Sequence, residues 1–297
     1  MRRLTLSTLL LALCCCATSA RQQTDREQQG FVGPVKTVSA ESIEPADNSG
    51  SVKEPERRRP LDTVTFDEQG REVSRVIYDD YSFLVGTQTN TYDAKGRLAE
   101  SSLKAEEKER QLREVYKYDD ASRLIEKLSY EGENADALKE TFSYDAQGRV
   151  DEIVLSYRGE VGGKTKFKYD GKGKVIEVAF YTAGGQPAVA PVGPCFGAHR
   201  LTYVHDARGR VIEEHAFKSD NSLKRKTVYG YDDKGNILKE SRNGQYGSDI
   251  FTHSYEFDPR GNWTQQKTRI VSQSSLTPGD PGHYERTLFT RRTITYY

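Results

Sequence analysis

The sequence is poor in cysteine, and this shortage excludes a disulfide-stabilised fold. Three of its four cysteines, Cys14, Cys15 and Cys16, are consecutive and lie near the N-terminus. If the chain is cleaved after Ala20, Cys195 is the one that remains, and a single cysteine forms no internal disulfide. We expect Cys195 to be a small loop residue rather than a reactive thiol.

Net charge and long apolar runs are lacking too. The chain has 44 basic and 44 acidic residues, so no bulk charge favours nucleic acid, a membrane surface or an acidic polymer as a partner. Its mean hydropathy is −0.77, and after residue 20 no apolar run is long enough to cross a bilayer as a helix. The sequence therefore predicts a chain that neither binds nucleic acid nor spans a membrane.

The first 20 residues have the three parts of a secretory signal peptide. Arg2 and Arg3 form a basic start, Leu4 to Leu13 an apolar run, and Ala17 to Ala20 a small-residue cleavage site. This pattern predicts an exported protein of the periplasm, the envelope or the extracellular space. The alternative is a lipoprotein anchored through Cys14, Cys15 or Cys16, although Leu13 is larger than the residue that usually precedes a lipidated cysteine.

An aromatic-Asp-x-x-Gly-Arg motif recurs eight times along the rest of the chain. The copies begin at Phe66, Tyr92, Tyr118, Tyr144, Tyr169, His205, Tyr231 and Phe257. Their aspartates are spaced by 26, 26, 26, 25, 36, 26 and 26 residues. A fixed period of this length is typical of a repeat protein, in which each copy is one supersecondary unit.

The motif has the residues that a tight turn between two strands requires. An aspartate at the first position of a type I turn accepts backbone N–H groups, and a glycine at the fourth adopts a positive φ. This is the hairpin connection that ends in a G1 bulge. Ser122 replaces the glycine in the third copy. The predicted turn residues are Asp67, Gly70, Asp93, Gly96, Asp119, Asp145, Gly148, Asp170, Gly173, Asp206, Gly209, Asp232, Gly235, Asp258 and Gly261.

Residues that flank each turn alternate as they do in strands. Tyr116 and Tyr118, or Phe167 and Tyr169, lie two apart, with polar residues between them. The 18 tyrosines and 11 phenylalanines, beside a single tryptophan and a single methionine, also favour half-buried strands. We predict an all-β fold, a long antiparallel meander of repeated β-hairpins that curls into a partial shell or open barrel with its aromatic side inward.

The predicted organisation has three parts. They are a signal peptide (1–20), an N-terminal strand with a mobile segment (21–60) and a hairpin-repeat domain (61–297). We expect strand 35–39 and loop 40–60 in the second part. In the third we expect loops at 131–138, 158–164 and 272–283, an insertion at 183–198 and a closing strand at 286–297.

The motif resembles the YD repeat, also called the rearrangement-hotspot (Rhs) repeat. The resemblance covers about residues 60–265 and rests on all eight copies. It implies β-hairpins that wind into a shell, which in large members encloses a toxin or presents an adhesive surface. This chain has far fewer repeats, no separate toxin domain and no self-cleaving core segment. The resemblance therefore implies architecture and leaves the activity open.

No catalytic or metal-binding motif accompanies the repeats. The five histidines, His199, His205, His215, His253 and His283, have no paired spacing typical of metal ligands. The segment 162–166 resembles a phosphate-binding loop but lacks its first glycine and its helix. The eight aspartates are explained by their turns, and arginines such as Arg97 and Arg149 are expected to pair with neighbouring carboxylates. Trp263 is expected to cap the last repeat. We predict no enzyme activity, metal or cofactor.

These observations favour an exported scaffold or binding protein without enzyme activity. An aromatic sheet face can stack on sugar rings or bind a protein, so carbohydrate or protein is the expected partner. One alternative is a remnant or accessory of an Rhs-type toxin or secretion system. Another, an outer-membrane β-barrel, is disfavoured because neither alternation face is continuously apolar.

Overall fold

The computed structural model describes residues 23–46, 56–79, 81–106, 111–132, 136–190, 197–245, 247–274 and 282–297. The predicted signal peptide and lipidation sites, residues 1–20, lie outside the described residues, as does Cys195.

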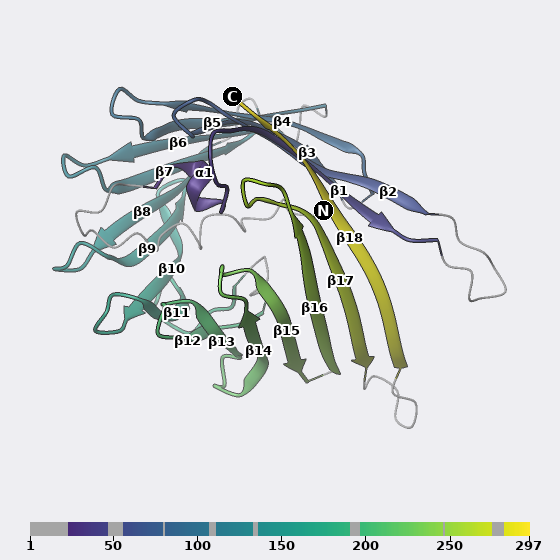
Figure 1. The fold of residues 1–297 in the computed structure, drawn as a ribbon. Helices are drawn as coiled ribbons and strands as arrows, with labels where there is room; N and C mark the ends of the chain where they lie inside the picture. The colour runs from purple at the N-terminus through teal and green to yellow at the C-terminus, as the bar shows by residue number, and fades with distance from the viewer. Residues whose placement is uncertain are drawn as a thin grey trace.

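The described chain forms one sheet of 18 strands and one short helix, α1 (Asp25–Gln28) (Figure 1). Each strand pairs antiparallel with the next along the chain, so the predicted all-β meander of hairpins is confirmed. The strands are β1 (Val35–Glu44), β2 (Arg57–Phe66), β3 (Glu72–Tyr78), β4 (Leu84–Tyr92), β5 (Leu98–Ala105), β6 (Leu112–Tyr118), β7 (Leu124–Glu131), β8 (Leu138–Tyr144), β9 (Val150–Tyr157), β10 (Glu160–Tyr169), β11 (Val175–Thr182), β12 (Arg200–His205), β13 (Val211–Phe217), β14 (Leu223–Tyr231), β15 (Ile237–Gly244), β16 (Gly247–Phe257), β17 (Trp263–Ser274) and β18 (Gly282–Tyr296).

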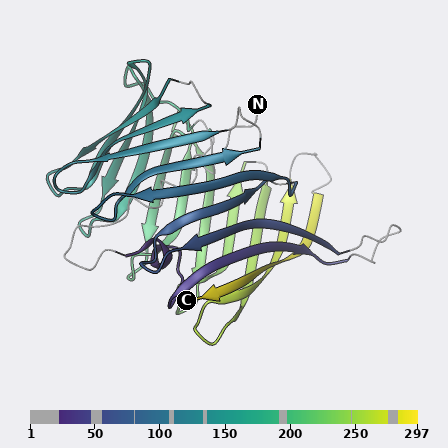
Figure 2. The same ribbon diagram turned by 90° about the horizontal axis from the view of Figure 1, so that it is seen from above.

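The first strand closes the sheet into a barrel. Strand β1 pairs with β2 on one side and with β18 on the other, so that Val38 lies opposite both Val64 and Ile294. The first and last strands therefore meet although they come from the two ends of the chain (Figure 2). Closure removes the edge strands on which other chains could otherwise pair. The sheet thus goes beyond the predicted partial shell or open barrel.

Several segments predicted as loops are strands. Strand β1 continues to Glu44 and β2 begins at Arg57, so both ends of the expected loop 40–60 belong to the sheet. The expected loop 158–164 is a two-residue turn at Arg158 and Gly159, both with positive φ. Loop 272–283 is shortened at both ends because β17 reaches Ser274 and β18 starts at Gly282, ahead of the expected 286. Polar composition misled the prediction at these sites, since most residues of these strand ends are polar.

All eight motif turns lie at one end of the barrel, which we call the turn end; the other is the loop end. At each turn the strand register shifts by one residue, as between Lys117 and Tyr118. This shift is the bulge that a type I turn followed by a left-handed residue imposes on a hairpin. The N-terminal segment 23–34 and the end of β18 also lie at the turn end, where Tyr297 N donates to Pro34 O.

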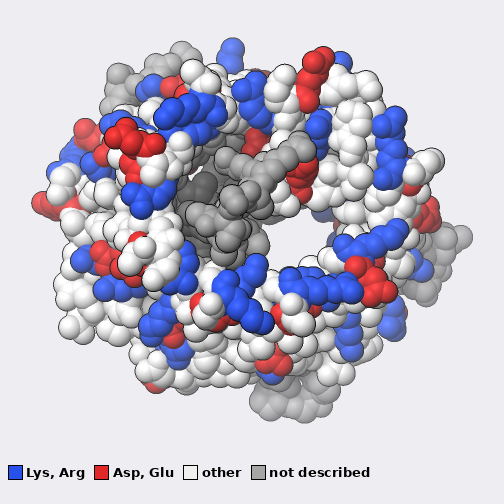
Figure 3. Space-filling model, turned by 60° about the vertical axis from the view of Figure 1, so that its left-hand side comes forward, with Lys and Arg blue, Asp and Glu red and all other residues white. Residues whose placement is uncertain are grey.

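Strand residues alternate between an inner and an outer face of the barrel. The inner face includes Val38, Val64 and Ile294, and α1 lies on this side of the wall (Figure 1). Side chains converge inside a curved sheet, and most of the fully buried strand residues are on this face: Val64, Phe66, Leu103, Phe142, Phe167, Val178, Leu201 and Ala216. Figure 3 shows the wall as a ring, with an opening to the right of its middle.

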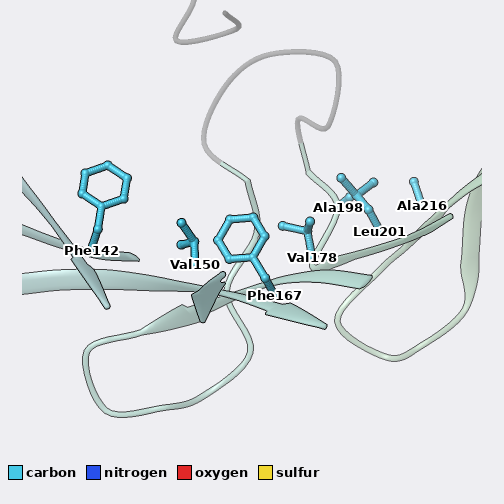
Figure 4. Packing of buried hydrophobic residues seen from close by; sticks show 7 residues of the cluster. All are labelled: Phe142, Val150, Phe167, Val178, Ala198, Leu201 and Ala216. Carbon is cyan, nitrogen blue, oxygen red and sulfur yellow. The ribbon is translucent and has the colours of Figure 1, made fainter. Parts of the chain in front are cut away.

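The described start of the insertion between β11 and β12 folds back beside β11. It turns at Thr182–Gln186 and runs back along β11, where Ala188 N donates to Phe180 O. Ala198 then joins the cluster formed by Phe167, Val178 and Leu201, whose side chains point to the same side of the sheet (Figure 4). In the described part of the insertion, Ala190 and Ala198 are buried, whereas residues 183–187 and Val189 are exposed.

Candidate functional site

The aspartate and glycine of each motif build the turn. In the fourth copy, Asp145 Oδ1 accepts from the backbone N–H groups of Gln147 and Arg149, both at 2.9 Å. Gly148 N donates to Asp145 O at 2.9 Å, and its φ is +77°. Corresponding contacts, with a left-handed fourth residue, occur at Asp67, Asp93, Asp119, Asp170, Asp206, Asp232 and Asp258. Ser122, at the glycine position, has a φ of +63°.

The arginine and the aromatic residue link each hairpin to the next. Arg149 Nε donates to Asp145 Oδ2 at 2.7 Å, and its guanidinium lies 4.4 Å from the ring centroid of Tyr169. The Tyr169 hydroxyl donates to Val150 O at 2.7 Å. We call this set of contacts a rung. Equivalent rungs join Arg71 to Tyr92, Arg97 to Tyr118, Arg123 to Tyr144 and Arg210 to Tyr231.

The rungs also set the protonation of their members. Hydrogen bonds from Arg97 hold the pKa of Asp93 below its usual value. Burial raises the pKa of Tyr118 to about 12. Asp93 therefore remains a carboxylate and Tyr118 a neutral donor at neutral pH. The arginine, aspartate and tyrosine of these rungs are engaged with one another, which leaves the ligand-binding chemistry to other side chains.

Rungs are altered where the motif departs from its pattern. Lys174 replaces the arginine before the insertion, and the next aromatic position holds His205. Asn236 replaces it in the seventh copy, where Lys234 lies 4.6 Å from the ring centroid of Phe257 instead. At the closing strand, Asn262 donates to the Tyr296 hydroxyl at 2.8 Å.

The inner face carries charges as well as aromatic rings. Lys127 is 3% exposed and lies between Glu140 and Glu114, whose Oε1 is 3.4 Å from the ammonium. Buried charges are tolerated when they are paired in this way. Inner-face cations paired with carboxylates are Arg75 with Asp62 and Glu72, Lys127 with Glu114 and Glu140, Arg225 with Glu214, Arg242 with Glu240 and Arg286 with Glu44.

An aromatic group on the inner face of β16–β18 is the best candidate for a binding site. Trp263 has its ring centroid 6.0 Å from that of Tyr255, which in turn lies 6.2 Å from that of Phe257. Arg292 lies over Trp263, 3.4 Å from the ring centroid, and 5.0 Å from the centroid of Phe31. We call these five residues the Trp263 cluster. Phe257 is 36% exposed, so part of its ring is free for contact.

Polar groups surround the Trp263 cluster. Gln266 Nε2 donates to the Tyr255 hydroxyl at 3.0 Å, and His253 Nδ1 lies 3.0 Å from Thr268 Oγ1. Burial lowers the pKa of His253, so its ring is neutral at neutral pH. Aromatic faces beside neutral donors and acceptors form a surface that can hold a sugar ring.

The N-terminal segment 23–34 brings Phe31 to this site. Its helix α1 begins with a capping box, in which Thr24 and Glu27 bond to each other's backbone N–H groups. Asp25 accepts from the Tyr92 hydroxyl at 2.7 Å, and Val32 N donates to Asn262 Oδ1 at 2.7 Å. The sequence analysis predicted no helix in this segment. The Thr-x-x-Glu spacing is the signal that could have indicated the helix.

Sequence reasoning found the turns but missed the site. It placed Trp263 as a cap of the last repeat and gave Arg292 no role, because the contact of Arg292 with Phe31 depends on barrel closure. Among the described residues there is no group of three or more His, Cys, Asp or Glu residues that could hold a metal ion. No described helix has the length and apolar character needed to cross a membrane.

A protein family and several solved structures illustrate what this chain is similar to. A family model described as an uncharacterised protein matches residues 63–189. No curated protein matches the sequence. A porin-like protein from Bacteroides uniformis is similar in structure, with a TM-score of 0.46 and 11% identity over 89% of this chain and 99% of that one.

Two further solved structures are similar over most of this chain. The complex TcdB2-TccC3-Cdc42 has a TM-score of 0.32 and 12% identity over 84% of this chain. TcdB2-TccC3 without its hypervariable C-terminal region has a TM-score of 0.31 and 13% identity over 80% of this chain. This chain spans 19% and 17% of those two chains.

Proposed function

We propose that this protein is an exported scaffold of the YD/Rhs-repeat type without enzyme activity, which binds carbohydrate on the inner face of its barrel. The observation that carries the proposal is the Trp263 cluster. It groups three aromatic rings of β16 and β17, with centroids 6.0 and 6.2 Å apart, and aromatic rings offer apolar faces on which a sugar ring can pack. Neutral hydrogen-bonding groups, Gln266 and His253, lie beside them.

Several other features support a binding role. The motif aspartates are engaged in turns and the arginines and tyrosines of the rungs contact each other, while the inner-face carboxylates named above are paired with cations. The basic start and apolar run of residues 1–20 support export, and the eight motif copies support the repeat assignment.

A glycan array tests this function, with the mature chain, residues 21–297, as the probe. We expect binding to a subset of glycans, and we expect Trp263→Ala to lose it while Tyr284→Ala retains it. Tyr284 is an exposed aromatic residue on β18 near the loop end. If no glycan exceeds background, carbohydrate binding is wrong. Capture of a specific protein in a pulldown would then favour the protein-binding alternative.

An outer-membrane barrel is the second candidate, favoured by closure of the 18-stranded sheet. The outer face opposes it, because a lipid-facing wall needs a continuous apolar band. Ion pairs occur on this face on many strands, among them Arg113–Glu100, Lys117–Glu126, Lys168–Glu177, Lys226–Glu213 and Arg269–Glu285. A role beside an Rhs-type secretion system is the third candidate, and secretion or immunity genes next to this gene would support it.

A further inference from the structure

Arg292 differs from the other inner-face cations named above because it forms no ion pair with any described residue. Within the described part of the chain, no oxygen accepts a hydrogen bond from its guanidinium, and no carboxylate lies within ion-pair distance. The carboxylate that acts on it most strongly is Asp62, which is held by Arg75 at 2.5 Å. Arg292 is therefore a partly buried cation whose nearest counter-charge is already engaged.

Two aromatic rings flank the guanidinium of Arg292 and leave its N–H groups as the part that a ligand can contact. Trp263 and Phe31 lie against its guanidinium, at 3.4 and 5.0 Å from their ring centroids. Stacking holds a guanidinium in place while its N–H donors, which lie in the plane of the group, stay directed away from the rings. These donors form a fork that matches the two oxygens of a carboxylate.

Energetics favour an anionic ligand at this position. A buried charge without a partner is unfavourable, and the burial lowers the pKa of Arg292 to about 10. The group still carries its proton at neutral pH. An incoming carboxylate would therefore pair with a cation that has already lost much of its hydration, so little further desolvation would offset the attraction.

We propose that Arg292 binds the carboxylate of an acidic sugar, a uronic acid, whose ring stacks on the aromatic rings of the Trp263 cluster. This inference rests on the proposed carbohydrate-binding function and names its ligand class. Tyr255 and Phe257 extend from Trp263 along the same inner face. A uronic acid combines the two chemistries that this site offers, a carboxylate for the fork and a ring face for the aromatic residues.

Trp263 allows a direct measurement, because it is the single tryptophan of the chain. Its fluorescence is titrated with a tri-galacturonic acid and with the methyl ester of the same sugar, which keeps the rings and removes the charge. We expect the acid to bind the wild-type chain at least about tenfold more tightly than the ester, as one charge-assisted contact provides.

Two substitutions at adjacent positions separate the roles of charge and fold. Arg292→Met is expected to bind acid and ester with equal affinity, at the level of the wild-type chain with the ester. Arg291→Met is the matched control, because Arg291 lies on the outer face and is exposed; it should keep the preference. Arg292→Lys keeps the charge without the fork and should keep part of the preference, which tests the role if Arg292→Met fails to fold.

The outcomes separate the two proposals. Equal binding of acid and ester by the wild-type chain would overturn the role of Arg292 and leave carbohydrate binding in place. If neither sugar binds and the glycan array is also blank, the proposed function itself is wrong. A preference for the acid that persists in Arg292→Met would place the anion at another cation.

Discussion

Single residues show why the motif is so regular. The glycine position needs a left-handed backbone, which costs a residue with a Cβ roughly 1 kcal/mol. Ser122 occupies this conformation with a φ of +63°. Its hydroxyl accepts a hydrogen bond from Arg97 at 3.3 Å, a long contact at an exposed site.

We expect Ser122→Gly to raise the free energy of unfolding by about 1 kcal/mol, because glycine adopts a positive φ without strain. The matched control is Gly148→Ser, at the same turn position of the next copy. A Cβ at Gly148 meets nothing within 4 Å. Gly148→Ser should therefore lower the free energy of unfolding by a similar amount, through backbone strain alone. Urea unfolding of the three proteins measures both changes. A loss of stability in Ser122→Gly would contradict the role of this position.

His253 provides a prediction about pH. In the folded chain, burial lowers the pKa of His253 below its ordinary value of 6.5. The unfolded chain therefore binds a proton at His253 more readily than the folded chain does. The contribution of the neutral ring is present above the unfolded pKa and is lost as the pH falls below it. We expect the melting temperature to drop less between pH 7.5 and pH 5 in His253→Gln than in the wild-type chain. The turn aspartates, with pKa values lowered from 3.8, titrate below this range and affect both proteins equally.

The pH test has a second histidine as its control. His283→Gln changes an exposed residue of β18 and should retain the wild-type drop in melting temperature. A drop in His253→Gln as large as that of the wild-type chain would mean that His253 is protonated as readily in the folded state as in the unfolded state.

At the scale of elements, the rungs link neighbouring strands and stabilise their pairing. Tyr144 of β8 donates its hydroxyl to Leu124 O of β7 at 2.6 Å, while Arg123 lies 4.8 Å from its ring centroid. Tyr144→Phe keeps the ring and its contact with Arg123 and removes one partly buried hydrogen bond. We expect a loss of about 1 kcal/mol in the free energy of unfolding. Tyr284→Phe, at a tyrosine that is 51% exposed, should change stability far less, and equal losses in both variants would contradict the rung.

Elements were predictable where their signals are local. Turn, bulge and hairpin at Asp145–Arg149 follow from five consecutive residues, so the sequence alone indicates them. Helix α1 was missed because its capping box is short and the segment has few apolar residues. The start of β10 was wrongly predicted as part of a loop at 158–164 because Gly162 and Gly163 suggest a break, whereas they lie inside the strand. The cation–π contacts of the rungs join residues about 20 positions apart, such as Arg149 and Tyr169, and depend on strand register.

The whole molecule is set by contacts that no local pattern encodes. Closure needs β1 to fit between β2 and β18, and the same closure brings Phe31 to Arg292. Alternation predicts a curved sheet but not the number of strands at which its edges meet. The candidate site depends on this closure, since Phe31 and Trp263 belong to opposite ends of the chain. This is why sequence reasoning recovered the wall of the barrel and not its site.

The outer face leads to a prediction for the molecule as a whole. Glu126 pairs with Lys117 and Lys139 from its two neighbouring strands, and Lys168, whose side chain is 70% exposed, pairs with Glu177. Such pairs contribute little to the free energy of unfolding, but they make the outer face hydrophilic. Transferring them into lipid would cost free energy. The mature chain, residues 21–297, should therefore remain a single monodisperse species in buffer without detergent.

Light scattering after size-exclusion chromatography, with and without detergent, measures this behaviour. The same elution and mass are expected in both conditions, and no protein should float with liposomes of bacterial lipid. Replacing Lys117, Glu126 and Lys139 together by Leu would create an apolar patch across β6, β7 and β8, and this variant should aggregate unless detergent is present. A wild-type chain that needs detergent or floats with the liposomes would instead favour the outer-membrane candidate, because only a wall that faces lipid gains from leaving water.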